Sequence, residues 1–129
     1  MTIDYASAGL LLETMAQARI SFDGDAWTNL FAEDAVSQTD PSEPAVVGHN
    51  ALRAELLAAA QAQEQVEFTW ERHWVVPPTI LAPWRMGYVD RQSRVRVSFA
   101  GFATLEIGQD GRIDRSRWWY FRRETPATG

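Results

Sequence analysis

The spacing of apolar residues divides the chain into a helical first half and a strand-forming second half. Between residues 8 and 22, apolar side chains recur every three or four positions, which is typical of an amphipathic helix. Asp4 or Ser7 can cap the N-terminus of this helix. A short second helix is expected over residues 25–31 and a third over residues 50–60, fraying in the polar stretch that follows.

From Val66 onward the apolar period changes to two, which indicates β-strands. We expect four long strands, over residues 66–76, 79–89, 94–107 and 112–123. Short strand-like islands at Val36 and at Val46–Val47 precede the third helix. This order predicts a single α+β domain over residues 1–124, with three N-terminal helices packed on a curved antiparallel or mixed sheet, and a disordered tail over residues 125–129.

The composition excludes several kinds of chemistry. The chain contains no cysteine, so disulfides, thiolate metal sites and a cysteine nucleophile are ruled out. All twelve basic residues are arginines, which excludes Schiff-base and general-base mechanisms that use lysine. The two histidines, His49 and His73, are 24 residues apart and make a poor metal site, and we interpret His49 as structural. We therefore expect neither a metal nor a cofactor.

Charge and hydropathy limit the possible partners. The net charge of −5 argues against a nucleic-acid partner, although the charge is unevenly distributed. Residues 1–64 contain ten acidic residues and two arginines, whereas residues 65–129 contain seven acidic residues and ten arginines. No apolar stretch approaches the roughly 20 residues that span a bilayer, and the N-terminus lacks the basic start of a signal peptide. We expect a cytoplasmic protein with no nucleic-acid and no membrane partner.

Three segments resemble a known family in their order and spacing. They are Asp25 to Val36, Gly48 followed by Ala51-Leu52-Arg53, and the hairpin from Leu105 to Ile113. Together they resemble the SnoaL-like branch of the nuclear transport factor 2 superfamily. The resemblance implies a cone-shaped half-barrel with a cavity between helices and sheet, and in many relatives a homodimer formed through the outer sheet face. Relatives include isomerases, cyclases, dehydratases, epoxide hydrolases and non-catalytic binding proteins, so the fold alone does not define a reaction.

The resemblance allows the family's catalytic positions to be compared with this sequence. Asp40, which precedes Pro41, is similar to the general base of the ketosteroid isomerase branch, but an Asp-Pro pair also forms turns in surface loops. The two oxyanion donors of that branch would fall at Met15 or Ala16 and at Ala103, so both are missing. A ketosteroid isomerase is therefore not predicted.

The catalytic positions of the other branches of the family fall on the last strand and at a histidine. The epoxide hydrolase and SnoaL branches carry aspartates on the last strand, where this chain has Trp118 and Phe121. His73 lies on a segment similar to one that carries a histidine in the scytalone dehydratase-like relatives, and an imidazole there could transfer a proton. If Trp70 and Trp74 line the cavity, however, strand alternation directs His73 away from it.

Aromatic residues are the most informative feature of the sheet half. Six tryptophans are more than a domain of this size needs for packing alone, so several are expected to line a cavity for a small apolar or aromatic ligand. The expected ligand-binding residues are Trp70, Trp84, Tyr88, Arg117, Trp119 and Tyr120. Arg117 has two interpretations: it binds an anionic or carbonyl ligand if its face is concave, or it pairs with glutamates if its face is the outer one.

Three functional hypotheses follow. The first is an isomerase, cyclase or dehydratase that acts by acid–base chemistry on an apolar, polycyclic or aromatic carbonyl compound. In it Asp40 or His73 transfers the proton, and Tyr88, Tyr120 or Arg117 polarises the carbonyl. The second hypothesis is a non-catalytic binding protein of the same fold. The third is a dimeric protein-interaction module.

Overall fold

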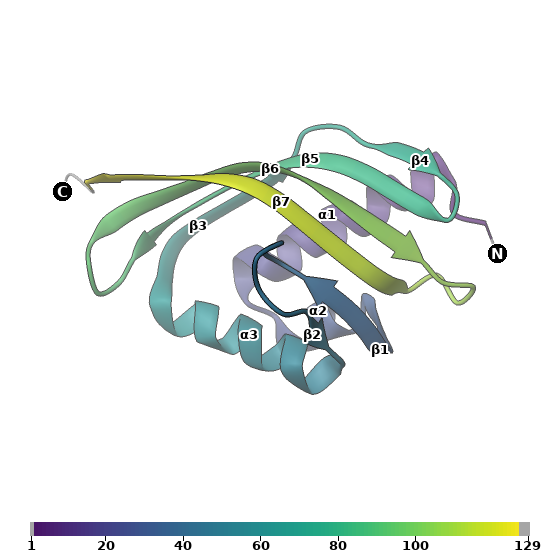
Figure 1. Cartoon of the computed structure of the whole chain (residues 1–129), viewed down its shortest axis with the longest axis horizontal. Coiled ribbons are helices and arrows are strands. Elements are labelled where there is room, and N and C mark those ends of the chain that lie inside the picture. The colour runs from purple at the N-terminus through teal and green to yellow at the C-terminus, as the bar shows by residue number, and fades with distance from the viewer. Residues whose placement is uncertain (1, 127–129) are drawn as a thin grey trace.

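The helices of the computed structural model, which describes residues 2–126, all lie on one side of a curved sheet (Figure 1). In chain order the elements are α1 (Tyr5–Ser21), α2 (Gly24–Thr28), β1 (Phe31–Gln38), β2 (Val46–Val47), α3 (His49–Ala62), β3 (Gln63–Trp70), β4 (Trp74–Val76), β5 (Thr79–Asp90), β6 (Val95–Ile107) and β7 (Ile113–Pro126). The seven-stranded sheet has the order β2-β1-β7-β6-β5-β3, with β4 paired to β5. Only the β1–β7 pairing is parallel among these strands, so the expected α+β class with a mixed sheet is confirmed.

Capping and an apolar stripe define α1. The Asp4 carboxylate accepts a hydrogen bond from the Ser7 N–H at 2.7 Å, so Asp4 is the N-cap. The helix ends where Phe22 adopts a left-handed conformation, with φ of 53°. The stripe that packs toward the sheet begins with Ala8, Leu12 and Met15.

Three element boundaries differ from those predicted from the spacing of apolar residues. Phe31 begins β1 instead of ending the second helix, because β1 pairs with β7 and the Ile113 N–H bonds to the carbonyl just before it. The island expected at Val36 is part of this eight-residue strand. At the other end, β7 continues to Pro126, so the first two residues of the expected tail belong to the sheet, and residues 127–129 lie outside the described residues.

A β-bulge in β7 determines which of its side chains face the helices. Ile113 pairs with Ile107 and Arg115 pairs with Glu106, so Asp114 is an extra residue in β7. Side chains of β7 beyond Asp114 therefore point to the face opposite to the one that simple alternation from Ile113 predicts. The inward-facing residues after the bulge include Ser116, Trp118 and Tyr120.

A second irregularity separates β3 from β4. Trp70 pairs with Trp84, whereas Trp74 pairs with Leu81, so three residues of one strand oppose two of the other. The single strand expected over residues 66–76 is consequently two strands. Trp70 packs against the core, but Trp74 lies on the opposite face and is 48% exposed. The expectation that these two tryptophans share a face was wrong because it assumed an unbroken strand.

The core fills the space between the helices and the concave face of the sheet. Its most deeply buried large side chains include Phe31, Leu52, Ile80, Leu105 and Ile113. The convex face carries no helix within the described range (Figure 1). Among the helices of residues 2–126, none has the length and apolar character to cross a membrane.

Candidate functional site

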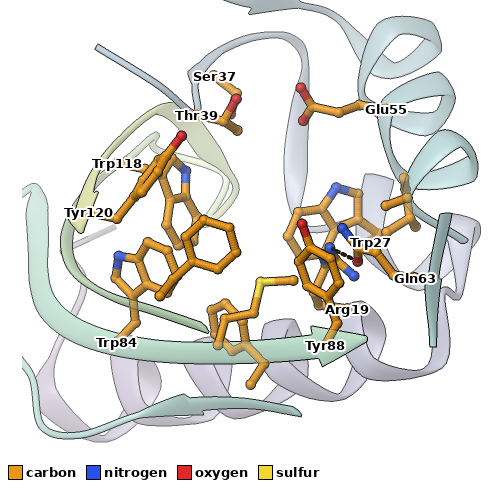
Figure 2. Close-up of a pocket in the computed structure, with 15 residues that line it drawn as sticks. Arg19, Trp27, Ser37, Thr39, Glu55, Gln63, Trp84, Tyr88, Trp118 and Tyr120 are labelled. Carbon is orange, nitrogen blue, oxygen red and sulfur yellow. Dashed lines mark hydrogen bonds between the residues drawn. The ribbon is translucent and has the colours of Figure 1, made fainter. Parts of the chain in front are cut away.

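A pocket of about 290 Å³ opens between the concave face of the sheet and the helices α1 and α3 (Figure 2). This volume is close to the lower end of ligand sites, roughly 300–1,000 Å³. Its lining residues are Arg19, Trp27, Ser37, Thr39, Glu55, Leu56, Ala59, Gln63, Phe68, Trp84, Met86, Tyr88, Phe99, Trp118 and Tyr120. Trp84, Trp118 and Tyr120 lie on one side of the pocket, and Arg19, Gln63 and Tyr88 lie on the other (Figure 2).

The aromatic side of the pocket is assembled from adjacent strands. The ring of Trp84 on β5 lies 5.4 Å from that of Trp118 on β7 and 5.8 Å from that of Phe68 on β3, measured between centroids. Phe99 on β6 lies 5.1 Å from Tyr120 in an edge-to-face arrangement. Such aromatic pairs are individually favourable and hold one another in place. They therefore present a rigid apolar surface to a ligand.

A glycine in β6 makes room for this arrangement. Gly101 pairs with Trp84 on one side and with Tyr120 on the other. A Cβ at this position would lie 2.0 Å from the carbonyl oxygen of Trp119 and 3.0 Å from the Trp84 ring. The close approach of β6 and β7 at the aromatic side of the pocket therefore requires glycine here.

A buried chain of hydrogen bonds fixes one of the indoles. The Trp118 Nε1–H donates to the Ser116 hydroxyl at 3.2 Å, and that hydroxyl donates to Ser37 on β1 at 2.8 Å. Both serines are almost fully buried. Since a buried polar group without a partner is costly, this chain orients Trp118 and ties β7 to β1.

Arg19 supplies the cation of the pocket. One terminal nitrogen of its guanidinium donates to the Gln63 side-chain carbonyl at 2.7 Å (Figure 2), whereas the other is buried and has no hydrogen-bond partner in the protein. Burial lowers the pKa of this guanidinium to about 10, and the neighbouring Tyr88 and Glu55 act in the opposite direction. Arg19 forms no salt bridge within residues 2–126.

Glu55 on α3 is the carboxyl group of the pocket lining. Part of its surface is open to solvent, yet the surrounding atoms desolvate the carboxyl and raise its pKa. The positive charge of Arg19 and the hydroxyl of Thr39 oppose this shift. Glu55 is thus a carboxyl group that holds its proton more firmly than a glutamate fully surrounded by water.

Asp40 has a different environment, although it is close to the pocket. Its carboxylate accepts hydrogen bonds from the Ser42 hydroxyl at 2.7 Å, the Ser42 N–H at 2.9 Å and the Tyr120 hydroxyl at 2.9 Å. The bonds from Ser42, followed by the bond from Tyr120, lower the pKa of Asp40. Burial and this carboxylate raise the pKa of Tyr120. Asp40 therefore acts as a turn former that also orients Tyr120, and its low basicity makes it a weak general base.

His73 lies away from the pocket. Its imidazole stacks on the Tyr5 ring with 4.0 Å between centroids, and its Nε2 is 3.0 Å from the Tyr5 carbonyl oxygen. A Cβ at Gly9 of α1 would lie 3.3 Å from the His73 ring, so glycine leaves room for the imidazole beside the helix. These contacts give His73 a structural role between α1 and the segment that joins β3 to β4. His49, interpreted as structural, likewise bonds to a backbone carbonyl, that of Phe31, at 2.8 Å.

The six expected ligand-binding residues divide into three groups. Trp84, Tyr88 and Tyr120 line the pocket. Trp70 packs behind the lining, with its ring 5.5 Å from that of Trp118. Arg117 and Trp119 lie on the outer face, where the guanidinium is 5.1 Å from the indole, and this corrects their expected place. The cause is the bulge in β7, which exchanges the two faces of the strand.

Arg19 and Glu55 are absent from the site expected from the sequence, although a signal for both exists. Arg19 continues the buried stripe of α1 at the four-residue step after Met15, and Glu55 lies beside the buried stripe of α3, three residues after Leu52 and next to Leu56. A charged residue on an apolar helical stripe is a candidate for a pocket. No group of three or more potential metal ligands occurs within the described part of the chain.

The chain belongs to the SnoaL-like domain family, whose model matches residues 12–116. The family expected from the three sequence segments is thereby confirmed. No curated protein sequence matches the chain.

Several solved structures have the same fold. RV0760c from Mycobacterium tuberculosis aligns with a TM-score of 0.82 at 16% identity, over 95% of this chain and 99% of that chain. A Δ5-3-ketosteroid isomerase from Mycobacterium sp. aligns with a TM-score of 0.79 at 18% identity, over 92% of this chain and 98% of that one. The epoxide hydrolase/cyclase-like enzyme SalBIII aligns with a TM-score of 0.81 at 16% identity, over 92% and 93% of the two chains. At these identities the similarity establishes the fold and leaves the reaction open.

Proposed function

We propose that this protein is a cofactor-independent isomerase, cyclase or dehydratase that acts on an apolar, polycyclic or aromatic carbonyl compound. The observation that carries the proposal is the Glu55 carboxyl at an otherwise largely aromatic pocket. Its raised pKa moves it toward the range in which a carboxyl group exchanges protons efficiently near neutral pH. Glu55 therefore replaces Asp40 and His73 as the proposed proton-transfer group.

The other lining residues support this chemistry by position. The aromatic side, formed by Trp84, Trp118 and Phe99, would hold the rings of the substrate. Glu55 would remove a proton from the carbon beside the carbonyl and return it to another carbon in an isomerisation, or to a leaving hydroxyl in a dehydration. The Tyr88 hydroxyl is the proposed donor to the carbonyl oxygen, since the Tyr120 hydroxyl already donates to Asp40.

A proton-exchange assay tests the proposal without knowledge of the natural substrate. The bicyclic ketone 2-tetralone is incubated with the protein in D₂O, and deuterium uptake beside the carbonyl is followed by NMR. We expect the wild-type protein to accelerate the exchange and Glu55→Gln to lose roughly 100-fold or more of that acceleration. Glu13→Gln, an exposed carboxylate of α1, is the matched control and should retain the full rate.

The same assay separates this proposal from the binding-protein hypothesis. His73→Ala should leave the exchange rate unchanged, and Asp40→Asn should reduce it only through the displacement of Tyr120. If 2-tetralone quenches tryptophan fluorescence but does not exchange faster than in buffer, the enzymatic proposal fails and the non-catalytic binding protein replaces it. An exchange rate that survives Glu55→Gln would instead overturn the role of Glu55.

The convex face of the sheet favours self-association as a second property. Phe121 is 88% exposed and Trp74 is 48% exposed on this face, which lies opposite the helices. Exposed large apolar residues on an uncovered sheet often mark interaction sites. We infer that two copies of the chain pair through this face, which leaves both pockets open on the helical side.

A further inference from the structure

The pocket holds a cation that forms no ion pair with the part of the chain that the structure describes. The Arg19 guanidinium uses one terminal nitrogen for Gln63, and its other terminal nitrogen is buried without a partner. The charge is retained at neutral pH because the lowered pKa of about 10 is still far above 7. A buried charge with unused donors is expensive to maintain unless an anion meets it.

The acidic residues nearby do not supply that anion. Glu55 is the acidic residue that influences the Arg19 charge, but the two side chains form no ion pair, so the buried guanidinium nitrogen stays without a partner. The Asp40 carboxylate is occupied by Ser42 and Tyr120. Tyr88 is the other group whose charge influences Arg19, and it carries a hydroxyl instead of a carboxylate.

We propose that the pocket takes an organic carboxylate, whose carboxylate group pairs with Arg19 and whose apolar ring system lies against the aromatic side. This inference rests on the proposed function only in that the pocket binds a small apolar molecule. Arg19 and the aromatic cluster of Trp84 and Trp118 occupy opposite sides of the pocket, so a ligand that contacts both must have one charged end and one apolar end (Figure 2).

The donors at the charged end fit a carboxylate better than a phosphate. The free guanidinium nitrogen of Arg19 can donate to one carboxylate oxygen, and the single negative charge of a carboxylate matches the single positive charge of Arg19. A phosphate dianion would need more cationic or backbone donors than this lining offers. The lining contains a single basic residue, Arg19.

The carboxylate would also affect Glu55. A negative charge bound in the same pocket disfavours ionisation of Glu55 and raises its pKa further than burial alone does. Binding of the ligand would thus move the pKa of Glu55, the proposed proton-transfer group, closer to 7. The ligand carboxylate at Arg19 and the carboxyl group of Glu55 would then influence each other through their charges, without direct contact.

Matched pairs of ligands test the proposal by isothermal titration calorimetry. The probes are aromatic carboxylic acids of one, two and three fused rings and the corresponding primary amides, which have a similar shape but no charge. We expect the acids to bind wild-type protein at least roughly tenfold more tightly than their amides. Arg19→Met should abolish this preference while leaving amide affinity within about threefold, because the apolar contacts remain.

Two further variants make the result specific. Arg112→Met removes the same charge from the exposed turn between β6 and β7 and should leave the preference unchanged. Arg19→Lys keeps the charge but loses the planar donor arrangement, so it should retain only part of the preference. If Arg19→Met does not fold, the acid-over-amide preference is measured with Arg19→Lys instead.

The outcomes distinguish this inference from the proposed function. If acids and amides bind equally, or if the preference survives in Arg19→Met, the inference is overturned while the pocket remains a ligand site. If no acid binds but 2-tetralone undergoes catalysed exchange, the inference fails and the proposed function stands. If the acids bind with the expected preference but no ketone is exchanged, the anion site stands and the enzymatic proposal fails.

Discussion

Arg19 lies on the buried stripe of α1, and Glu55 lies at the edge of the buried stripe of α3, where it borders the pocket. At such positions an apolar residue would add to the core, whereas a charged residue carries a desolvation cost. The pocket exists because these helices place polar groups opposite the aromatic face of the sheet. Proteins commonly accept lower stability at functional sites, so the two residues should be replaceable with a gain in stability.

Replacement of Arg19 by methionine should raise the thermal unfolding midpoint, in spite of the hydrogen bond to Gln63 that is lost. The side chain would keep much of its packing, and the unbalanced charge would disappear. The Gln63 carbonyl is only partly buried and can bond to water instead. Differential scanning calorimetry of wild type, Arg19→Met and Arg112→Met checks this expectation. A lower midpoint for Arg19→Met alone would mean that the charge is already balanced within the protein.

The stability effect of Glu55 should depend on pH in a defined direction. Because its pKa is raised in the folded protein, folding favours the protonated form, and stability falls as pH rises through the folded-state pKa. Glu55→Gln should therefore raise the unfolding midpoint at pH 7 by a few degrees at most, with the difference vanishing below the ordinary glutamate pKa of about 4.3. Thermal unfolding followed by circular dichroism across pH 3.5–8 measures this, with Glu13→Gln as control. A difference that grows toward low pH would have the wrong sign.

The elements show which parts of the fold and site could be predicted from the sequence. Asp4 as cap, the helical stripes and the period of two beyond Val66 are local signals, and the three helices and long strands follow from them. The face of a side chain, in contrast, depends on every bulge before it. One extra residue at Asp114 moved Arg117 and Trp119 to the outer face and Trp118 to the pocket. Nothing local in the sequence marks that insertion.

Gly101 provides a test of how the strands build the pocket. A Cβ there would lie 2.0 Å from the Trp119 carbonyl oxygen, and a backbone atom cannot move away without disrupting the β6–β7 pairing. Gly101→Ala should cost about 2–4 kcal/mol of unfolding free energy, the range of severe packing defects. Gly87→Ala on β5 is the matched control, since its Cβ would find its nearest neighbour at an ordinary 3.7 Å. Urea unfolding of both variants measures the difference, and equal effects would contradict the close approach at Gly101.

At the scale of the whole molecule, the concentration of arginines in the second half of the sequence reflects ion pairs on the outer face of the sheet. Ion pairs on the outer face join Arg85 to Glu71 at 2.6 Å and Arg115 to Glu106 at 3.5 Å. Exposed pairs of this kind add little stability, but each places a carboxylate beside an arginine of the sheet half. The outer face is therefore not a continuous basic surface. The interpretation that placed these arginines on the outer face opposite glutamates agrees with the structure.

Beside these ion pairs, the outer face exposes Trp74 and Phe121, and so offers apolar surface for a second copy of the chain. Phe121→Glu would place a charge at the most exposed aromatic of this face and should convert a dimer into a monomer in sedimentation-velocity experiments. Leu10→Glu makes the same kind of change at a 70% exposed residue of α1, on the helical side, and should leave the dimer intact. The acid-over-amide preference should be equal in both variants, because the pocket opens on the concave side and is complete within one chain. A monomeric wild type, or a dimer that survives Phe121→Glu, would show that this face is not where two chains meet.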